Sequence, residues 1–155
     1  MLLFFVIDVL LIKVFASEVK TSTNPQAISL IADKVKRDVN ERLVFSGEVS
    51  VSSAEWKIRG AKGILDEKIG KLKTIKVMGN PAEIETTTQS QYGSSIGSAK
   101  ELTLDLAADK LELTGNAKFD SESQSLRADK IYYDITTRSM KTKGSRVKFI
   151  SEKSN

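Results

Sequence analysis

The sequence predicts an all-β fold built from short antiparallel strands. Apolar residues recur at every second position over most of the chain after residue 28, a pattern typical of strands with one buried face. Short polar breaks separate these runs, and no segment after residue 30 requires an amphipathic helix. Strands that recur at this spacing favour a sandwich, a barrel or a roll.

Residues 1–16 are almost wholly apolar and differ in composition from the rest of the chain. The boundary between Ala16 and Ser17 resembles a signal-peptidase site, because small or modest residues precede a polar break. Asp8 lies inside the run and no basic residue precedes it, so a membrane anchor remains the alternative, although a spanning helix needs about 20 residues. A buried N-terminal strand is a third possibility. We expect a signal peptide over 1–16, a flexible lead over 17–27 and one domain over 28–150.

The strands of this domain follow one another between polar breaks. The first is expected near Ile28 and Leu30, although residues 31–42 can also be drawn as a helix. The clearest alternation predicts strands over 43–51, 102–106 and 111–119, with breaks at 38–42, 107–110, 120–124 and 136–139. The polar, glycine-bearing stretch Thr86–Ser98 is the longest predicted loop. The last strand is predicted over Arg146–Ile150, and residues 151–155 form a disordered tail.

The chain also repeats itself. A shift of 68 residues lays Leu43–Val51 over Leu111–Phe119 in one register. Gly47 and Gly115 coincide in mid-strand, where glycine usually marks a bulge or a close approach. The repeat therefore indicates duplicated strand–turn–strand units stacked along one axis.

The composition excludes several kinds of chemistry. The 155 residues include no Cys and no His, so disulfides, Cys/His zinc sites and Ser-His-Asp triads are ruled out. The net charge is +4, but the basic residues are spread along the chain without a stacking set of aromatics, which argues against nucleic-acid binding. We expect no metal and no cofactor. A carboxylate-based glycan hydrolase using Asp105 and Glu112 is the weakest hypothesis, because no motif accompanies these acids.

Several motifs resemble the OstA-like domain family. They are Ala32-Asp33, Phe45-Ser-Gly47-Glu-Val49 and Gly79-Asn-Pro-Ala82-Glu-Ile84, followed by Leu113-Thr-Gly-Asn-Ala117 and Leu126-Arg-Ala-Asp-Lys-Ile-Tyr-Tyr-Asp134. The resemblance covers about residues 26–150. It implies an antiparallel β-jellyroll, a V-shaped open roll of stacked strands around an apolar groove. It also implies a periplasmic bridge that carries lipopolysaccharide from the inner-membrane exporter, through an LptC-like partner, to an LptD-like outer-membrane translocon.

Two functional hypotheses follow from this resemblance. The first is a bridge without catalytic residues that binds the lipid A acyl chains of lipopolysaccharide. The second is a membrane-tethered, LptC-like component of the same system, in which residues 2–16 stay as an anchor. In both hypotheses the protein binds acyl chains in an apolar trough, because each exposed CH₂ of an acyl chain costs about 0.8 kcal/mol in water.

The candidate groove residues have two origins. The inward positions of the family map onto Ile28, Leu30, Ile84, Leu104 and Leu106. The alternation of this sequence adds Phe45, Leu111, Leu113 and Phe119. A closed core built from the same residues is the alternative to a groove.

The two ends of the predicted roll leave strand edges unpaired, and unpaired N–H and C=O groups invite a further strand. The resemblance favours head-to-tail self-association, in which the C-terminal edge of one copy pairs with the N-terminal edge of the next. Such a contact is heterologous and can build an open filament.

Overall fold

The computed structural model describes residues 28–68, 71–86, 94–122, 124–144 and 146–151. In these ranges the chain forms strands and turns but no helix, and every strand pairing is antiparallel. The all-β prediction is confirmed, and the expected signal peptide and flexible lead lie outside the described residues. The strands are β1 (Ser29–Ile31), β2 (Lys34–Arg37), β3 (Leu43–Ser52), β4 (Trp56–Lys68), β5 (Lys71–Thr86), β6 (Ser95–Asp105), β7 (Lys110–Asp120), β8 (Gln124–Asp134), β9 (Met140–Lys143) and β10 (Lys148–Ser151).

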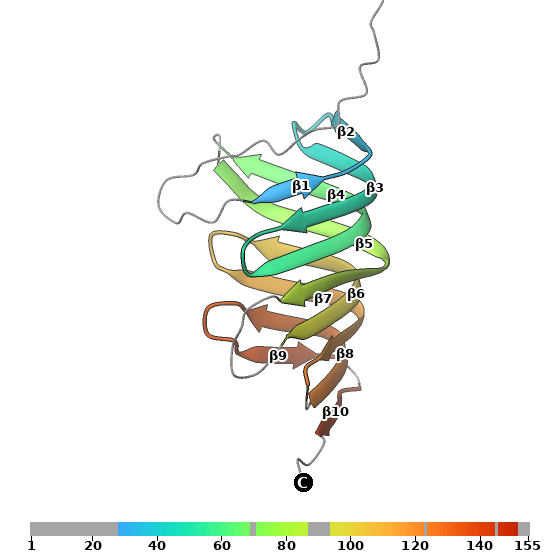
Figure 1. The fold of residues 1–155 in the computed structure, drawn as a ribbon, viewed down its shortest axis with the longest axis vertical. Helices are drawn as coiled ribbons and strands as arrows, with labels where there is room; N and C mark the ends of the chain where they lie inside the picture. Colours follow the sequence, from blue (N-terminus) through green and yellow to red (C-terminus); the bar gives the residue numbers. More distant parts are fainter. Residues whose placement is uncertain (1–27, 69–70, 87–93, 123, 145, 152–155) are drawn as a thin grey trace, which may run out of the picture.

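The described strands form one sheet in which β3 to β8 each pair with the next strand along the chain (Figure 1). At one end, β1 and β2 both pair with β3, each along a different half of it. At the other end, β10 and β9 both pair with β8, each along a different half of it. The sheet is therefore a stack of eight levels, of which the first and the last are strands broken in the middle.

Every long strand pair has a register shift near the middle of its strands, and these shifts lie side by side across the sheet. The register shifts fall between Ser46 and Val49 in β3 and between Thr114 and Ala117 in β7, with matching shifts in the pairs between them. Bulges bend strands and increase their twist, and Figure 1 shows the long strands curling back on one side of the stack. The aligned bulges therefore fold one sheet into two arms that meet at a corner.

Two of the bulges at the corner contain Gly47 and Gly115, the glycines that the sequence repeat aligns. Gly47 and Gly115 have φ angles of 74° and 84°, and the next residues, Glu48 and Asn116, are also left-handed at 44° and 51°. Glycine adopts this region without strain, which explains why it stands in the middle of both strands. The duplication read from the sequence is thus a repeat of one corner geometry.

We name the two arms by their edge strands. The β1/β10 arm contains β1, the halves 49–52, 56–59, 82–86, 95–98, 117–120 and 124–128 of the long strands, and β10. The β2/β9 arm contains β2, the halves 43–46, 62–68, 71–78, 101–105, 110–114 and 130–134, and β9. The sheet stays open along both edges and does not close into a barrel, which confirms the predicted open roll.

Some predicted boundaries differ from the structure. The predicted loop Thr86–Ser98 is shorter, because β6 begins at Ser95, whose N–H is 3.0 Å from the Thr86 hydroxyl oxygen that accepts its hydrogen bond. Residues 31–42 contain the end of β1, all of β2 and a turn rather than a helix. The last strand begins at Lys148 and extends to Ser151, one residue into the predicted tail, and residues 152–155 lie outside the described ranges.

Candidate functional site

Three rows of inward-facing side chains run across the strands from one end of the stack to the other. Alternation along each strand puts these side chains on one face, and pairing between strands puts them in line. In the β2/β9 arm the rows are Leu43, Leu65, Ile75, Leu104, Leu111 and Tyr133, and Phe45, Gly63, Val77, Leu102, Leu113 and Ile131. In the β1/β10 arm the row is Leu30, Val51, Ile58, Ile84, Gly97, Phe119, Leu126 and Phe149.

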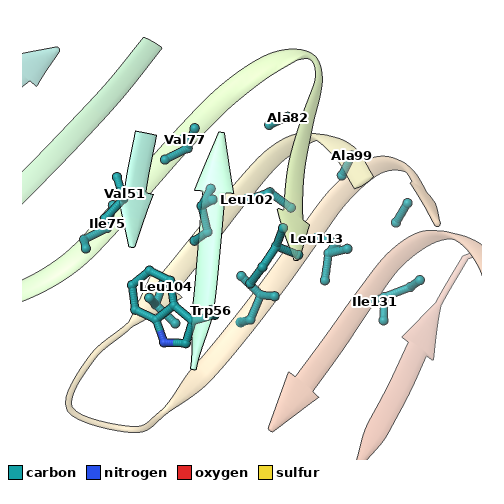
Figure 2. Close-up of a cluster of buried hydrophobic side chains, with 14 of the residues drawn as sticks. Val51, Trp56, Ile75, Val77, Ala82, Ala99, Leu102, Leu104, Leu113 and Ile131 are labelled. Atoms are coloured by element: carbon teal, nitrogen blue, oxygen red, sulfur yellow. The ribbon is translucent and has the colours of Figure 1, made fainter. Parts of the chain in front are cut away.

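The rows of the two arms pack against each other as one apolar cluster. Figure 2 shows side chains of both arms in it, with Val51 and Trp56 from the β1/β10 arm and Ile75 and Leu104 from the other. The arms contact each other directly: a Cβ built on Gly97 would lie 2.9 Å from Leu113 Cδ2 of the opposite arm. The absence of a side chain at Gly97 thus makes room for Leu113.

An aromatic contact joins the arms farther from the corner. The ring centroids of Phe119 and Tyr133 are 5.2 Å apart, with 35° between the ring planes. Phe119 belongs to the β1/β10 arm and Tyr133 to the β2/β9 arm. Burial among these apolar groups raises the pKa of the Tyr133 hydroxyl. The inner surface is consequently filled by its own side chains in this structure, and the arms meet near the mouth of the V.

The structure brings all nine candidate groove residues to this inner surface. Six are buried in the cluster: Phe45, Ile84, Leu104, Leu111, Leu113 and Phe119. The other three are partly buried and pack against it: Ile28 precedes β1, Leu30 lies in β1, and Leu106 follows β6. All nine side chains therefore belong to the one apolar cluster or pack against it.

The sequence interpretation missed several members of the cluster. Trp56 is 3% exposed, and Ile58, Ile75, Val77 and Ile131 are at most 1% exposed. Their strands, β4, β5 and β8, carry the same alternation, and the sequence Trp56-Lys-Ile58 shows it directly. The candidate residues were taken from other strands, so the inward positions of β4, of the first half of β5 and of β8 were left out.

The outer face carries ion pairs and no buried polar side chain within the described residues. Lys76 Nζ lies 2.9 Å from Glu101 Oε1, Lys118 Nζ lies 2.5 Å from Asp120 Oδ2, and Lys130 pairs with Glu112. These pairs bridge neighbouring strands or neighbouring positions of one strand. The roll is therefore apolar inside and charged outside.

Glu112 and Asp105, the two acids of the hydrolase hypothesis, both form contacts that stabilise the fold. The ammonium group of Lys130 hydrogen-bonds Glu112 and lowers the pKa of this carboxyl. A general acid working near neutral pH requires a raised pKa instead. Asp105 Oδ1 accepts hydrogen bonds from the N–H groups of Ala107 and Ala108, both at 3.0 Å, and so closes the turn after β6. Over the described part of the chain, no three acidic groups gather in a way that suits a metal ion.

This combination defines a class of protein: an open antiparallel β-roll with a continuous apolar interior, a charged exterior and, over the described residues, unpaired strand edges at both ends. Residues 29–139 match the family described as LptA/(LptD N-terminal domain) LPS transport protein. The match covers more than half of the chain, and the chain belongs to this family.

The chain is similar to one curated protein in sequence and to one solved structure in fold. The chain is 26% identical over 125 residues to the lipopolysaccharide export system protein LptA of Haemophilus influenzae, an alignment that covers 77% of this chain and 72% of that protein. Its fold matches the crystal structure of LptH from Pseudomonas aeruginosa with a TM-score of 0.76 at 18% identity, covering 83% of this chain and 96% of the other. LptH is described as the LptA-homologous periplasmic component of the conserved lipopolysaccharide transport device. Both relatives are named as components of lipopolysaccharide export or transport.

The described residues of this chain contain no helix of the length and apolar character needed to cross a membrane.

Proposed function

We propose that this protein is a periplasmic bridge that binds lipopolysaccharide and carries it between the inner and outer membranes along the inner surface of the roll. Membership of the family and the similarity to LptA favour this function over the tethered, LptC-like alternative. The names of the relatives also argue against an enzyme. The partners that fit this role are an LptC-like inner-membrane protein on one side and an LptD-like outer-membrane protein on the other.

The observation that carries the proposal is the continuity of the three inner rows. A closed core needs apolar side chains only at its centre, whereas here the row in the β1/β10 arm runs from Leu30 on one edge strand to Phe149 on the other. Phe149 is 58% exposed at the end of this row. An apolar row that reaches the open ends of a domain suits a ligand that passes through.

Lipid entry requires the arms to part. An acyl chain between them would replace contacts such as the one between Phe119 and Tyr133, and each buried CH₂ contributes about 0.8 kcal/mol to offset the lost packing. The corner can act as the fixed end of this opening, because strands stay paired on both sides of the bulges. The phosphate groups of the lipid would remain outside, where lysines are available.

The same topology supports head-to-tail self-association. β10 runs from the corner outward and β1 runs from the outside to the corner, so β10 of one copy can pair antiparallel with β1 of the next. The same holds for β9 and β2. Stacking in this way would continue both the alternation of strand direction and the inner rows from one copy to the next.

Photocrosslinking tests the lipid path. A photoreactive side chain placed at Ile84, Leu104 or Leu106 is expected to capture lipopolysaccharide in cells, because these positions lie on or against the inner surface. The matched control is Asp105, which lies between Leu104 and Leu106 on the opposite face of the strand and binds the turn instead.

Equal capture at Leu104 and Asp105 would contradict an inner lipid path. Leu104→Asp should weaken lipid binding, but burial of a charge in the cluster also threatens the fold. Circular dichroism of this variant must therefore show the strand content of the parent before a loss of binding is attributed to the lipid path.

Export is tested by the N-terminus of the protein isolated from cells. A mature chain that begins at or near Ser17 and is recovered in the periplasmic fraction would agree with cleavage after Ala16. An intact Met1 in the membrane fraction would favour the tethered alternative.

A further inference from the structure

Both edge strands of the β2/β9 arm carry lysines on the outer face. All residues of β2 and β9 are exposed. In β2, Val35 lies opposite the inward-facing Phe45, so Lys34 and Lys36 point outward. In β9, Thr142 lies opposite the inward-facing Ile131, so Lys141 and Lys143 also point outward.

The register aligns these lysines across the whole sheet. The outer row that begins at Lys36 continues through Val44, Ile64, Lys76, Thr103, Glu112 and Tyr132 and ends at Lys141. The parallel outer row begins at Lys34 and ends at Lys143. When two copies stack so that the inner rows stay continuous, Lys36 of one copy faces Lys141 of the other, and Lys34 faces Lys143.

None of the cross-strand partners of these four lysines is acidic; the nearest carboxylates are Asp33, which precedes Lys34, and Asp129, whose carboxylate lies against Gly144. Their cross-strand partners are Ser46, Val44, Lys130 and Tyr132, and the charge of Lys130 is matched by Glu112. Among the residues that the structure describes, none of the four takes part in an ion pair. Like charges directly opposite each other on a sheet are destabilising.

The other arm has no such conflict. Leu30 of β1 and Phe149 of β10 end the same inner row, and Ile31 and Ile150 are exposed beside them. A joint between copies therefore brings apolar residues together in the β1/β10 arm and four ammonium groups together in the β2/β9 arm. Cross-strand neighbours on a sheet are about 5 Å apart and diagonal ones about 7 Å, which lets four lysines surround one small anion.

We propose that the joint between two copies is a phosphate site, formed by Lys34 and Lys36 of one copy and Lys141 and Lys143 of the next, and that its occupation promotes head-to-tail assembly. The proposal rests on the self-association described under the proposed function. A phosphate carries up to two negative charges and several acceptor oxygens, and lysine binds it as a compact charge. Inorganic phosphate and the phosphate groups of lipopolysaccharide share this chemistry.

The test compares assembly in sodium phosphate and in sodium chloride at equal ionic strength. Sedimentation velocity of the full chain as isolated from cells, over a concentration series, is expected to show head-to-tail oligomers at several-fold lower protein concentration in phosphate. The variant Lys141→Gln/Lys143→Gln should assemble equally in both salts, because the repulsion and the site are both removed. The matched control Lys57→Gln/Lys73→Gln, which removes the same charge from the inner strands β4 and β5, should keep the phosphate response.

Intact and dephosphorylated lipopolysaccharide, added in chloride buffer, distinguish the two sources of phosphate: promotion by the intact form alone assigns the site to the lipid. Equal assembly of the parent in phosphate and chloride would overturn the proposal, because screening by salt alone would then explain the behaviour. A phosphate response that survives in the Lys141/Lys143 variant would also overturn it. A parent protein that stays monomeric in both salts would contradict both the phosphate site and the head-to-tail assembly. The lipid path is tested separately, by capture of lipopolysaccharide at Leu104.

Discussion

Gly115 is a corner residue whose backbone conformation favours glycine. Its φ of 84° lies in the left-handed region, and a Cβ there would approach the Lys100 side chain at 3.1 Å. Gly115→Ala is therefore expected to lower the free energy of unfolding by about 1–2 kcal/mol, the cost of a left-handed conformation for an L-residue. Urea unfolding followed by Trp56 fluorescence measures this change.

The neighbouring residue provides the control for this prediction. Asn116 is exposed and also left-handed, with a φ of 51°. Asn116→Gly should leave the free energy of unfolding within about 0.5 kcal/mol, since glycine tolerates the conformation and little packing is lost. If Gly115→Ala proves as stable as the parent, the corner does not depend on a left-handed glycine.

Glu112 and Lys130 predict a small acid dependence of stability. The hydrogen bond from Lys130 lowers the pKa of Glu112 below its ordinary 4.5 in the folded state. The unfolded state then binds more protons, so this stabilisation is complete above the ordinary pKa and is lost as the pH falls through the folded value. Both side chains are about one third exposed, so we expect an effect of about 1 kcal/mol or less.

The variant Glu112→Gln isolates this effect. Its stability should vary less than that of the parent between about pH 5 and 3, as measured by urea unfolding at each pH. Thr114→Ala removes the hydroxyl that also donates to Glu112 at 3.1 Å and should change the profile only slightly. An unchanged profile in Glu112→Gln would show that the pair does not contribute.

At the scale of the elements, each arm of the roll is half of every long strand, and the arms are held together by apolar contacts. Trp56 is the only tryptophan of the chain and lies in the cluster between the arms, 3% exposed. A brominated fatty acyl chain quenches indole fluorescence on contact. We expect such a chain to quench Trp56 in a saturable manner, because an acyl chain between the arms must touch the cluster.

The control moves the probe to the outer face. Tyr132 is 38% exposed on β8 and lies opposite Glu112. In the variant Trp56→Phe/Tyr132→Trp the indole should not be quenched in this saturable way. Equal quenching at both positions would mean that the acyl chain binds nonspecifically to the surface.

At the scale of the whole molecule, free edges at both ends of the stack predict concentration-dependent oligomers. Deletion of residues 146–155 removes β10, whose partner among the described strands is β8, and leaves β3 to β8 intact. The truncated protein should fold but associate much less than the full chain. Light scattering at rising concentration measures both proteins, and a truncated form that associates equally well would contradict assembly through this edge.

The spacing along such an oligomer is a second observable. The described residues form eight levels, and strands in a sheet lie about 4.8 Å apart, so each copy should add roughly 40 Å to the length. Small-angle scattering or electron microscopy of the oligomers measures this increment. A much smaller increment would indicate side-by-side association instead.

The all-β class, the open roll implied by the family resemblance and the inward phase of all nine candidate residues could be predicted from the sequence alone. Alternation and mid-strand glycines are local signals, and side chains of one phase must share a face once the strand forms. The repeat also indicated the bulges at Gly47 and Gly115, because glycine in the middle of a strand often marks a bulge.

How these strands meet could not be predicted from the sequence. The contact between Phe119 and Tyr133, the place of Gly97 against Leu113 and the alignment of Lys36 with Lys141 depend on the register of many successive pairings. The register between strands is set by the bulges of the corner and by packing between the arms. The periodicity within a single strand carries no information about either. Trp56 and Ile75 were not named as candidates, because only the packing of the other arm against these strands shows which of their side chains are buried.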